Sequence, residues 1–564
     1  MKKLLALLLS VLVVISLFAG CGGGGNDDTT PGNNDATQGT QGDDSVKATW
    51  PEDLTLTIGL ANNALVEDHD TNAFTLWLEE QTGIDIQFQK YQPLENDYRS
   101  QLSVAMVDGE ELPDLIIGLS LGRGVFQEYG EDGYFIDLAP FFEDKELSGE
   151  WWERFNTLEE GYKDYITRNM TSDDGETIYV FPTIETSPYD IIDYQAFINQ
   201  EWLNKLNLPM PTDIDSLYTT LKAFKTQDPN GNGKADEYPL MGSTTNGVYG
   251  DVVSWIINMY TFYDDSQMWR VAEDGTFSHI YASDAYREGL KTIHKWYKEG
   301  LLAWNDSSEN VKNLINPADD VATLGIYLGH PTIVGMNSKV FMQYEAMPYW
   351  GCAVENQHRN HYTCHITSDC EYPEAAWEIL MLMSSLEGGY RQRYGELGVD
   401  WEWSDGGKSF LDWDAEIKVI NPSVWSNIGN ACWQNIQASI LLAAENETVE
   451  LSEDSAPWVQ HKFKIMADCY NNFQEAKKNN PDNIPRYIVY TVEQEEEVTH
   501  LRANCKDWIL NARVGFCKGN GEQFNDPNND AQWNAYVAGI EAQGMTKWMG
   551  MAEEIYAETY GTKG

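Results

Sequence analysis

Segments with the composition of strands alternate with helical segments over the first part of the folded chain. Leu54–Ala61, Ile84–Tyr91 and Asp114–Gly118 are rich in apolar and β-branched residues. The segments between them, 72–80 and 98–107, carry apolar residues at helical spacing. Since parallel strands need a crossover between them, this alternation predicts βαβ units and an open α/β sheet.

The carboxyl ends of these strands predict where a ligand would bind. In open α/β sheets, ligands lie beyond the carboxyl ends of the strands. Asn62, Asn63, Glu67, Gly118 and Ser120 follow the first and third predicted strands. We therefore expect these residues near a binding site.

A cation-binding loop is predicted at residues 228–237, directly after an amphipathic helix that begins with a capping-box pattern at Thr212–Asp215. Side-chain oxygens at alternate positions of such a loop converge on a hard cation, and Gly233 stands where the EF-hand loop turns. Position twelve, normally Glu, is Pro239, which excludes a complete EF-hand. The alternative is a polar turn without metal. The predicted ligands of a structural calcium ion are Asp228, Asn230, Asn232, the backbone carbonyl of Lys234, Asp236 and Glu237.

The first 21 residues have the form of a secretory leader. Lys2 and Lys3 precede an apolar run, 4–18, that is too short for a stable membrane span. The run ends at Ala-Gly-Cys, which resembles a bacterial lipobox, so Cys21 is the predicted site of acylation. An ordinary cleaved leader is the alternative. Residues 22–48 are almost free of apolar side chains, which predicts a flexible tether.

The charge of the chain excludes one class of partner. Lys and Arg number 37 against 89 Asp and Glu, for a net charge of −52, which argues against nucleic acid and against anionic lipid surfaces. Attachment to a membrane would then depend on the lipid alone. The seven cysteines after Cys21 cannot all pair within one chain, and their spacing does not reveal a pairing: Cys352, Cys364, Cys370, Cys432, Cys469, Cys505 and Cys517.

Catalytic and zinc-binding motifs are weak in this sequence. It has no Gly-x-Ser-x-Gly, no His-Glu-x-x-His and no phosphate-binding loop. A cysteine–histidine cluster between 352 and 370 matches no standard zinc spacing, and we interpret it as part of a loop and a buried strand. We therefore expect a protein that is not an enzyme.

The segment 199–237 carries a resemblance to a known family. Asn-x-x-Trp-Leu-x-Lys-Leu, a Pro-Thr pair, the amphipathic helix and the Asp-Pro-Asn-Gly-Asn-Gly-Lys-x-Asp-Glu loop resemble the family 1 extracellular solute-binding proteins. These are lipid-anchored receptors of carbohydrate-type ABC importers. Further landmarks extend from about Leu54 to about Tyr560, and they are weakest at 404–495.

The resemblance implies a two-lobed α/β fold of the periplasmic-binding-protein type II. Each lobe would be built on an open α/β sheet, with the ligand in a cleft between the lobes. Residues 1–20 would be the leader and 21–50 the lipidated tether. Lobe 1 would comprise 51–185 and about 366–420, and lobe 2 would comprise 186–365 and about 421–564.

The resemblance also implies a function. A monomer on the outer face of the bacterial cytoplasmic membrane would capture a solute by lobe closure and deliver it to the membrane subunits of an ABC importer. An oligosaccharide is the favoured solute, because the resemblance agrees with a content of 20 Trp and 30 Tyr. Two alternatives stay open: a surface-anchored glycan-degrading enzyme, and a calcium-dependent adhesion or scaffold module. The identity of the solute and of the permease is also open.

Ligand contacts are predicted at aromatic and polar side chains, because rings stack on sugar rings while carboxylates and amides bind hydroxyls. Core packing is the competing interpretation for every ring. Trp401 and Trp403 follow Asp400 in a loop-like segment, where both interpretations have equal support. The candidates are Asn62, Glu67, Tyr189, Trp255, Tyr327, His330, Asp400, Trp401, Trp403 and Trp433.

Overall fold

The computed structural model divides the chain into two units, Met1–Thr49 and Trp50–Gly564. Cys21 and the tether belong to the first unit, which lies outside the described residues, as does His330. The structure describes residues 50–189, 191–192, 195–242, 251–263, 268–272, 275–305, 308–315, 317–329, 339–354, 359–422, 424, 427–442, 447–450, 455–478, 482–483 and 488–560.

The first sheet begins with the predicted βαβ units. β1 pairs in parallel with β2, with Leu56 opposite Ile86, and in parallel with β3, with Ile58 opposite Leu115. The predicted parallel arrangement is therefore confirmed. The sheet has six strands in the order β15-β4-β12-β3-β1-β2. Its strands are β1 (Thr55–Ala61), β2 (Asp85–Tyr91), β3 (Leu115–Ile116), β4 (Phe181–Glu185), β12 (Arg359–Ile366) and β15 (Ile440–Leu441).

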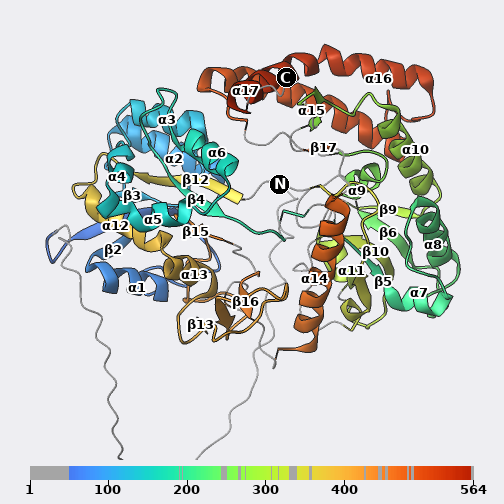
Figure 1. Ribbon diagram of the computed structural model, residues 1–564, viewed down its shortest axis with the longest axis horizontal. Helices are drawn as coiled ribbons and strands as arrows, with labels where there is room; N and C mark the ends of the chain where they lie inside the picture. Colours follow the sequence, from blue (N-terminus) through green and yellow to red (C-terminus); the bar gives the residue numbers. More distant parts are fainter. Residues whose placement is uncertain are drawn as a thin grey trace, which may run out of the picture. The chain divides into compact units, whose positions relative to one another are not determined.

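Segments that are far apart in the sequence complete this sheet. β12 pairs antiparallel with β3 and β4, and β15 pairs in parallel with β4. Figure 1 shows the yellow strand β12 beside the blue and cyan elements of the first part of the chain. The helices around this sheet are α1 (Ala73–Thr82), α2 (Glu95–Asp108), α3 (Arg123–Glu131), α4 (Ala139–Glu143), α5 (Lys145–Phe155), α6 (Glu160–Met170), α12 (Pro373–Ser384) and α13 (Leu386–Tyr394).

The second sheet has five strands in the order β11-β5-β10-β6-β9. β10, β6 and β9 are parallel, while β5 pairs antiparallel with β10 and β11. Its strands are β5 (Ala196–Asn199), β6 (Tyr238–Gly242), β9 (Leu302–Trp304), β10 (Leu324–Leu328) and β11 (Tyr344–Ala346). The helices that pack with it are α7 (Gln200–Leu206), α8 (Ile214–Thr226), α9 (Val252–Asn258), α10 (Asp284–Lys298), α11 (Ser308–Ile315), α14 (Pro457–Lys477), α15 (Val492–Lys518), α16 (Asp530–Ala542) and α17 (Met545–Tyr560), with a 3-10 turn at Phe341–Gln343.

The helix before the predicted calcium loop begins one residue later than the sequence pattern indicates. Asp213, not Thr212, is the N-cap of α8, and its side chain accepts a hydrogen bond from the backbone N–H of Ser216 at 2.7 Å. The Ser216 hydroxyl accepts from the backbone N–H of Asp213 in return. A capping box therefore exists, but the prediction of Thr212 and Asp215 as its two members is wrong.

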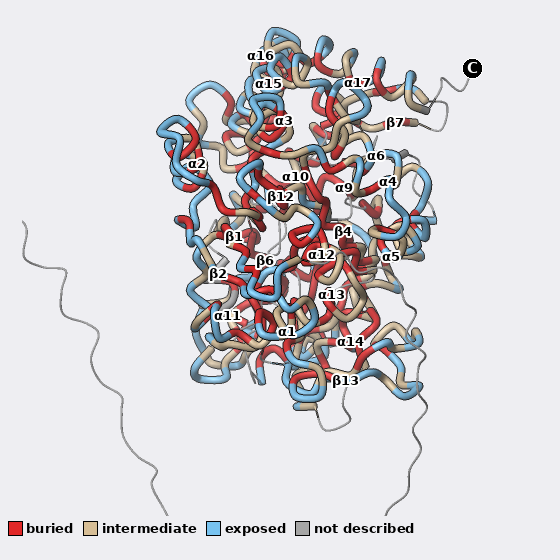
Figure 2. The backbone as a smooth tube through the Cα atoms, turned by 90° about the vertical axis from the view of Figure 1, so that its left-hand side faces the viewer, coloured by how far each residue is buried: buried red, intermediate tan, exposed pale blue. Residues whose placement is uncertain are grey.

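Two large hydrophobic cores form around the two sheets. The first core contains residues of β1, β3, β4 and α12, and it also includes Trp433, Ala438 and Ile440. It therefore draws on the chain beyond residue 420, later than the lobe boundary expected from the sequence. The central strand β4 is buried along its length, whereas the edge strand β2 is partly exposed, and Figure 2 shows exposed residues on helices such as α1 and α2.

Two small sheets and a third core complete the described fold. The sheets are β13 (Trp401–Trp403), β14 (Ile417–Val419) and β16 (Val449–Glu450), and β17 (Asp482–Asn483), β7 (Arg270–Ala272) and β8 (Phe277–Ser278). The third core contains Tyr390, Trp401, Ile417, Leu441 and Val449. Over the described residues, no helix has both the length and the apolar character needed to cross a membrane.

Candidate ligand pocket and calcium loop

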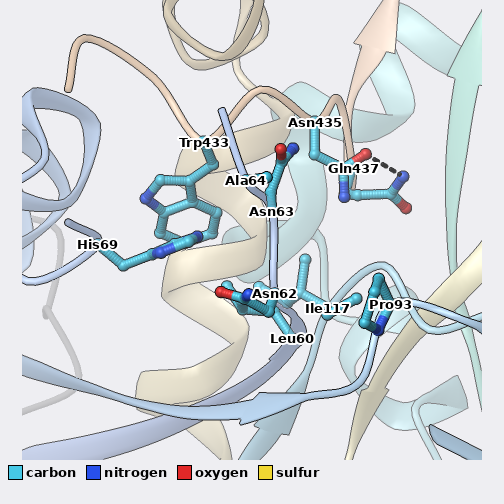
Figure 3. Close-up of a pocket in the computed structure, with 11 residues that line it drawn as sticks. Leu60, Asn62, Asn63, Ala64, His69, Pro93, Ile117, Trp433, Asn435 and Gln437 are labelled. Atoms are coloured by element: carbon cyan, nitrogen blue, oxygen red, sulfur yellow. Dashed lines mark hydrogen bonds between the residues drawn. The ribbon is translucent and has the colours of Figure 1, made fainter. Parts of the chain in front are cut away.

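A pocket of about 410 Å³ lies at the carboxyl ends of β1 and β3. The backbone N–H of Asn62 donates to Tyr91 O at 2.9 Å, so the pairing of β1 with β2 continues up to the pocket. The residues that line the pocket come from four parts of the chain, and they meet where the βαβ topology predicts a ligand site. Figure 3 shows the lining residues, which are Leu60, Ala61, Asn62, Asn63, Ala64, His69, Pro93, Ile117, Trp433, Asn435 and Gln437.

Trp433 supplies the large aromatic surface of the pocket. Its indole N–H donates to the Thr75 hydroxyl at 2.8 Å, and its ring makes edge contacts with Phe74 and Phe88 at 5.0 and 5.5 Å between centroids. These contacts fix the orientation of the ring. In Figure 3, the His69 ring lies beside Trp433, and the two centroids are 6.4 Å apart.

Two amide side chains hold the pocket together. Asn63 accepts from Leu65 N at 2.9 Å and donates to Gln434 O at 3.3 Å. The buried amide oxygen of Gln437 accepts from the hydroxyls of Thr363 and Thr183, and its nitrogen donates to the side-chain oxygen of Asn435. These groups are already occupied, so they support the pocket more than they serve a ligand.

Two further amides are available to a ligand. Asn62 and Asn435 are exposed, and the Asn62 side chain makes no hydrogen bond to the described residues. Asn435 uses its oxygen to accept from Gln437, which leaves its NH₂ group as a donor. Together they offer both donors and acceptors, as sugar hydroxyls require.

Gly118 allows Asn435 to approach β3. It follows β3 with φ +77°, and a Cβ atom there would lie 2.7 Å from Asn435 Nδ2. Any other residue would strain the backbone and displace the amide. The sequence analysis places Gly118 near the site for its position at a strand end, and the structure adds this steric reason.

His69 is neutral at physiological pH. Burial and the nearby Lys90 ammonium lower the pKa of the imidazole from 6.5 to about 4, against the opposing effect of Asp70 and Asp68. The ring therefore offers one donor and one acceptor, with no charge.

The structure brings only two of the predicted ligand residues, Asn62 and Trp433, into the pocket. Glu67 is exposed and does not line it. Tyr189, Trp255 and Tyr327 are buried in the second core. None of the three lines this pocket, so we do not assign them to this site.

The predicted cluster at 400–403 also lies outside the pocket. Asp400 is buried, and its carboxylate accepts from Glu396 N and Asn421 Nδ2, both at 2.9 Å. Trp401 is fully buried and donates from its indole N–H to Gly395 O at 2.8 Å. Trp403 alone stays 44% exposed. Asp400 and Trp401 therefore have structural roles.

Sequence reasoning missed His69, Pro93, Asn435 and Gln437. Pro93 follows β2, so the rule that points to Asn62 could have found it. Asn435 and Gln437 lie in the stretch where the sequence has no landmark, and they reach the pocket only through long-range packing. No local signal identifies them.

The loop 228–237 has a shape that suits a cation. Asp228 accepts from Asn232 N at 3.1 Å and Gly233 N at 3.0 Å, and Asn232 donates to the Asp236 carboxylate at 3.1 Å. Gly231 and Gly233 have positive φ, at 74° and 75°. The chain therefore curls around its own side-chain oxygens.

Glu237 adds an unsatisfied oxygen to this loop. Its Oε1 is buried with no hydrogen-bond partner, and burial followed by the charges of Asp236 and Asp228 raises the pKa of its carboxyl. A cation among these carboxylates would remove the repulsion. Among the described residues, no three His, Cys, Asp or Glu side chains converge as a metal site, so amide and backbone oxygens would have to complete the ligand set.

The seven cysteines after Cys21 are all free thiols in the structure. Burial raises the pKa of Cys364 and Cys370 to about 12 in each case. His365 donates from Nδ1 to the backbone carbonyl oxygen of Tyr179 at 2.8 Å. His358 of the same sequence cluster lies outside the described residues. Cys364, His365 and Cys370 are buried, whereas His361 is exposed and Cys352 is half-buried in a loop.

Comparison with known proteins identifies relatives over most of the chain. A fructooligosaccharide ABC transporter substrate-binding protein, FusA of Streptococcus pneumoniae, is 23% identical over 517 residues, 86% of this chain and 87% of the relative. Lipoprotein LipO of Bacillus subtilis is 27% identical over 245 residues, 41% of this chain and 43% of the relative. Over most of its length the chain is therefore similar to a substrate-binding protein of an ABC transporter. No family model matches it.

Solved structures show the same fold. An HMO-binding, ABC-transporter-associated solute-binding protein from Bifidobacterium longum infantis matches with a TM-score of 0.70 at 18% identity, over 90% of this chain and 99% of that chain. An EF-hand mutant of S. pneumoniae FusA in complex with fructo-nystose matches with a TM-score of 0.64 at 20% identity, over 90% and 99%. The predicted two-lobed solute-binding fold is confirmed. This substrate-binding protein has binding proteins, not enzymes, as its relatives.

Proposed function

We propose that this substrate-binding protein captures an oligosaccharide and delivers it to an ABC importer. The observation that carries the proposal is the pocket at the ends of β1 and β3. Trp433 is a lining residue that is 3% exposed, Asn62 offers its whole amide to a sugar hydroxyl, and Asn435 offers its NH₂ group. The ligands of two similar proteins, fructooligosaccharide for FusA and HMO for the Bifidobacterium protein, support an oligosaccharide.

The proposal includes a calcium ion in the loop 228–237, held by Asp228, Asn230, Asn232, Asp236, Glu237 and the Lys234 carbonyl. The partnerless buried oxygen of Glu237 supports it. The existence of an EF-hand mutant of S. pneumoniae FusA supports it as well. The ion would supply positive charge that stabilises the loop between α8 and β6. The loop belongs to the part of the chain that forms the second core, whereas the pocket belongs to the part that forms the first core. The ion therefore has a structural role.

The proposal also includes attachment through acylated Cys21, with the pocket acting outside the cytoplasmic membrane as a monomer. The leader pattern and the relative named Lipoprotein LipO support this part. Metabolic labelling of the expressing cell with a fatty-acid probe tests it. We expect label in the wild type and none in Cys21→Ser, and equal labelling of both would contradict the anchor.

Thermal shift of the protein from Cys21 onward tests the receptor function. Ligands that bind only the folded state raise the melting temperature by mass action. We expect a rise with one class of oligosaccharide, and no turnover of that sugar by chromatography. Hydrolysis products would contradict a pure receptor, and the absence of any shift across an oligosaccharide panel would contradict the sugar cargo.

A further inference from the structure

The lining of the pocket carries no formal charge at neutral pH over the described residues. Of its side chains, four are amides, five are aliphatic, and two are the rings of His69 and Trp433. Neither Asp, Glu, Lys nor Arg is among them. His69 adds no charge, because burial and Lys90 keep its pKa near 4.

The surroundings of the pocket disfavour an anion. Asp68 and Asp70 lie close enough to His69 to oppose the lowering of its pKa, and Glu67 is exposed in the same segment. Lys90 is the one cation that acts on this ring among the groups identified, and it does not line the pocket. A carboxylate brought into the pocket would lose water and find no cation with which to pair.

The available hydrogen-bonding groups instead suit hydroxyls. Asn62 offers a donor and an acceptor, Asn435 offers a donor, and neutral His69 offers one of each. A hydroxyl both donates and accepts, whereas a carboxylate only accepts. A carboxylate beside the Asn62 amide oxygen would therefore repel it and would leave that acceptor without a donor.

We infer that the pocket selects uncharged glycans and rejects glycans that contain uronic acid. This inference rests on the proposed oligosaccharide function and narrows its substrate class. Selection would come from the free-energy cost of burying an unpaired carboxylate beside amides. It would require no side chain that clashes with the carboxylate.

Calorimetric titration of the calcium-loaded protein with two panels tests the inference. One panel holds neutral oligosaccharides, including kestose and galacto-, xylo- and malto-oligosaccharides. The other holds galacturonate and alginate oligomers of equal length. We expect saturable binding in the neutral panel, and uronate binding weaker by about 100-fold or more.

A charge-insertion variant sharpens the test. Asn62→Lys places a cation at the pocket, and we expect it to raise uronate affinity by about tenfold while it weakens neutral binding. Asn156→Lys is the matched control, since Asn156 is the exposed C-cap residue of α5 and does not line the pocket. We expect the control to bind like the wild type.

The two proposals fail in different ways. Uronate binding as tight as neutral binding in the wild type, or no gain in Asn62→Lys, would overturn the selection and leave the oligosaccharide receptor standing. A lack of binding in both panels by a protein that melts cooperatively would overturn the oligosaccharide function itself.

Discussion

Trp433 serves the core and the pocket with the same side chain. Its indole N–H is fixed on Thr75 and its edges pack on Phe74 and Phe88, so it is almost fully buried and still lines the pocket. The core-packing interpretation therefore holds for this ring, and its contact with a ligand stays a prediction. Burial alone does not separate core tryptophans from ligand platforms.

Trp433→Ala should lower the free energy of unfolding by about 3–5 kcal/mol and remove most oligosaccharide affinity. Trp433→Phe keeps a ring but leaves the Thr75 hydroxyl without its donor, at a cost of about 1–3 kcal/mol, and should retain measurable binding. Urea denaturation and calorimetry check both variants. Trp403→Ala, at an exposed ring outside the pocket, is the control. Full affinity in Trp433→Ala would remove Trp433 from the site.

Glu237→Gln should have opposite effects with and without calcium. The raised pKa of Glu237 means that ionisation destabilises the folded state, so this contribution is favourable below the unfolded-state pKa and is lost as pH rises through the folded-state value. Because glutamine has no ionisable carboxyl, the variant avoids this loss of stability. In EDTA at pH 7, the variant should melt at or above the melting temperature of the wild type. Added calcium should raise the melting temperature of the variant by less than it raises that of the wild type. Differential scanning calorimetry checks this, with the exposed Glu80→Gln in α1 as control. A calcium response equal to that of the wild type would argue against the loop site.

His365 should make stability depend on pH. Burial lowers the pKa of its imidazole from 6.5 to about 4, despite the hydrogen bond to Tyr179 O. The unfolded chain therefore takes up a proton between these pH values before the folded chain does, and stability falls on acidification from 6.5 towards 4. The lowered pKa of His69 likewise makes stability fall on acidification. His365→Gln should flatten the dependence of melting temperature on pH over this window. An unchanged slope would contradict the neutral buried imidazole.

At the scale of elements, local signals predicted the parts of the fold that local chemistry determines. The alternation of strands and helices gave β1, β2 and β3 their parallel order, and strand-end topology pointed to Asn62. β15 and the segment with Asn435 join the same sheet region from more than 300 residues away, where periodicity carries no information about partners. The part of the candidate site that Asn435 and Gln437 supply could therefore not be predicted.

The start of α8 shows the limit of a local motif. Thr212 and Asp213 are both good N-cap residues, and the sequence cannot choose between them. Asp213 takes the role because its extended backbone, with φ −160° and ψ 174°, aims its carboxylate at Ser216 N. The choice is one of backbone geometry, which a pattern of residue types does not contain.

Asp213→Ala should destabilise the protein by about 1 kcal/mol, since the N–H of Ser216 loses its acceptor. Thr212→Ala should change stability much less. Chemical denaturation of the two single variants checks the assignment. The reverse order of effects would return the cap to Thr212.

At the scale of the whole molecule, the first core carries the pocket and the second core's part of the chain carries the cation loop. The chain as a whole has a net charge of −52, whereas the lining of the pocket is uncharged over the described residues. Neutral cargo would therefore meet no electrostatic barrier, whereas anionic cargo would meet one before it reached the site. Both the local lining and the overall charge favour an uncharged glycan.

Calorimetric titration of wild type and Asn62→Ala/Asn435→Ala with the oligosaccharide that gives the largest thermal shift tests the central claim most directly. The account predicts a single saturable site in the wild type and affinity weaker by about 10- to 100-fold in the variant, because the Asn62 amide and the Asn435 NH₂ donor are removed. Equal affinity in the two proteins would show that the sugar binds elsewhere, and would contradict the assignment of the pocket at the ends of β1 and β3.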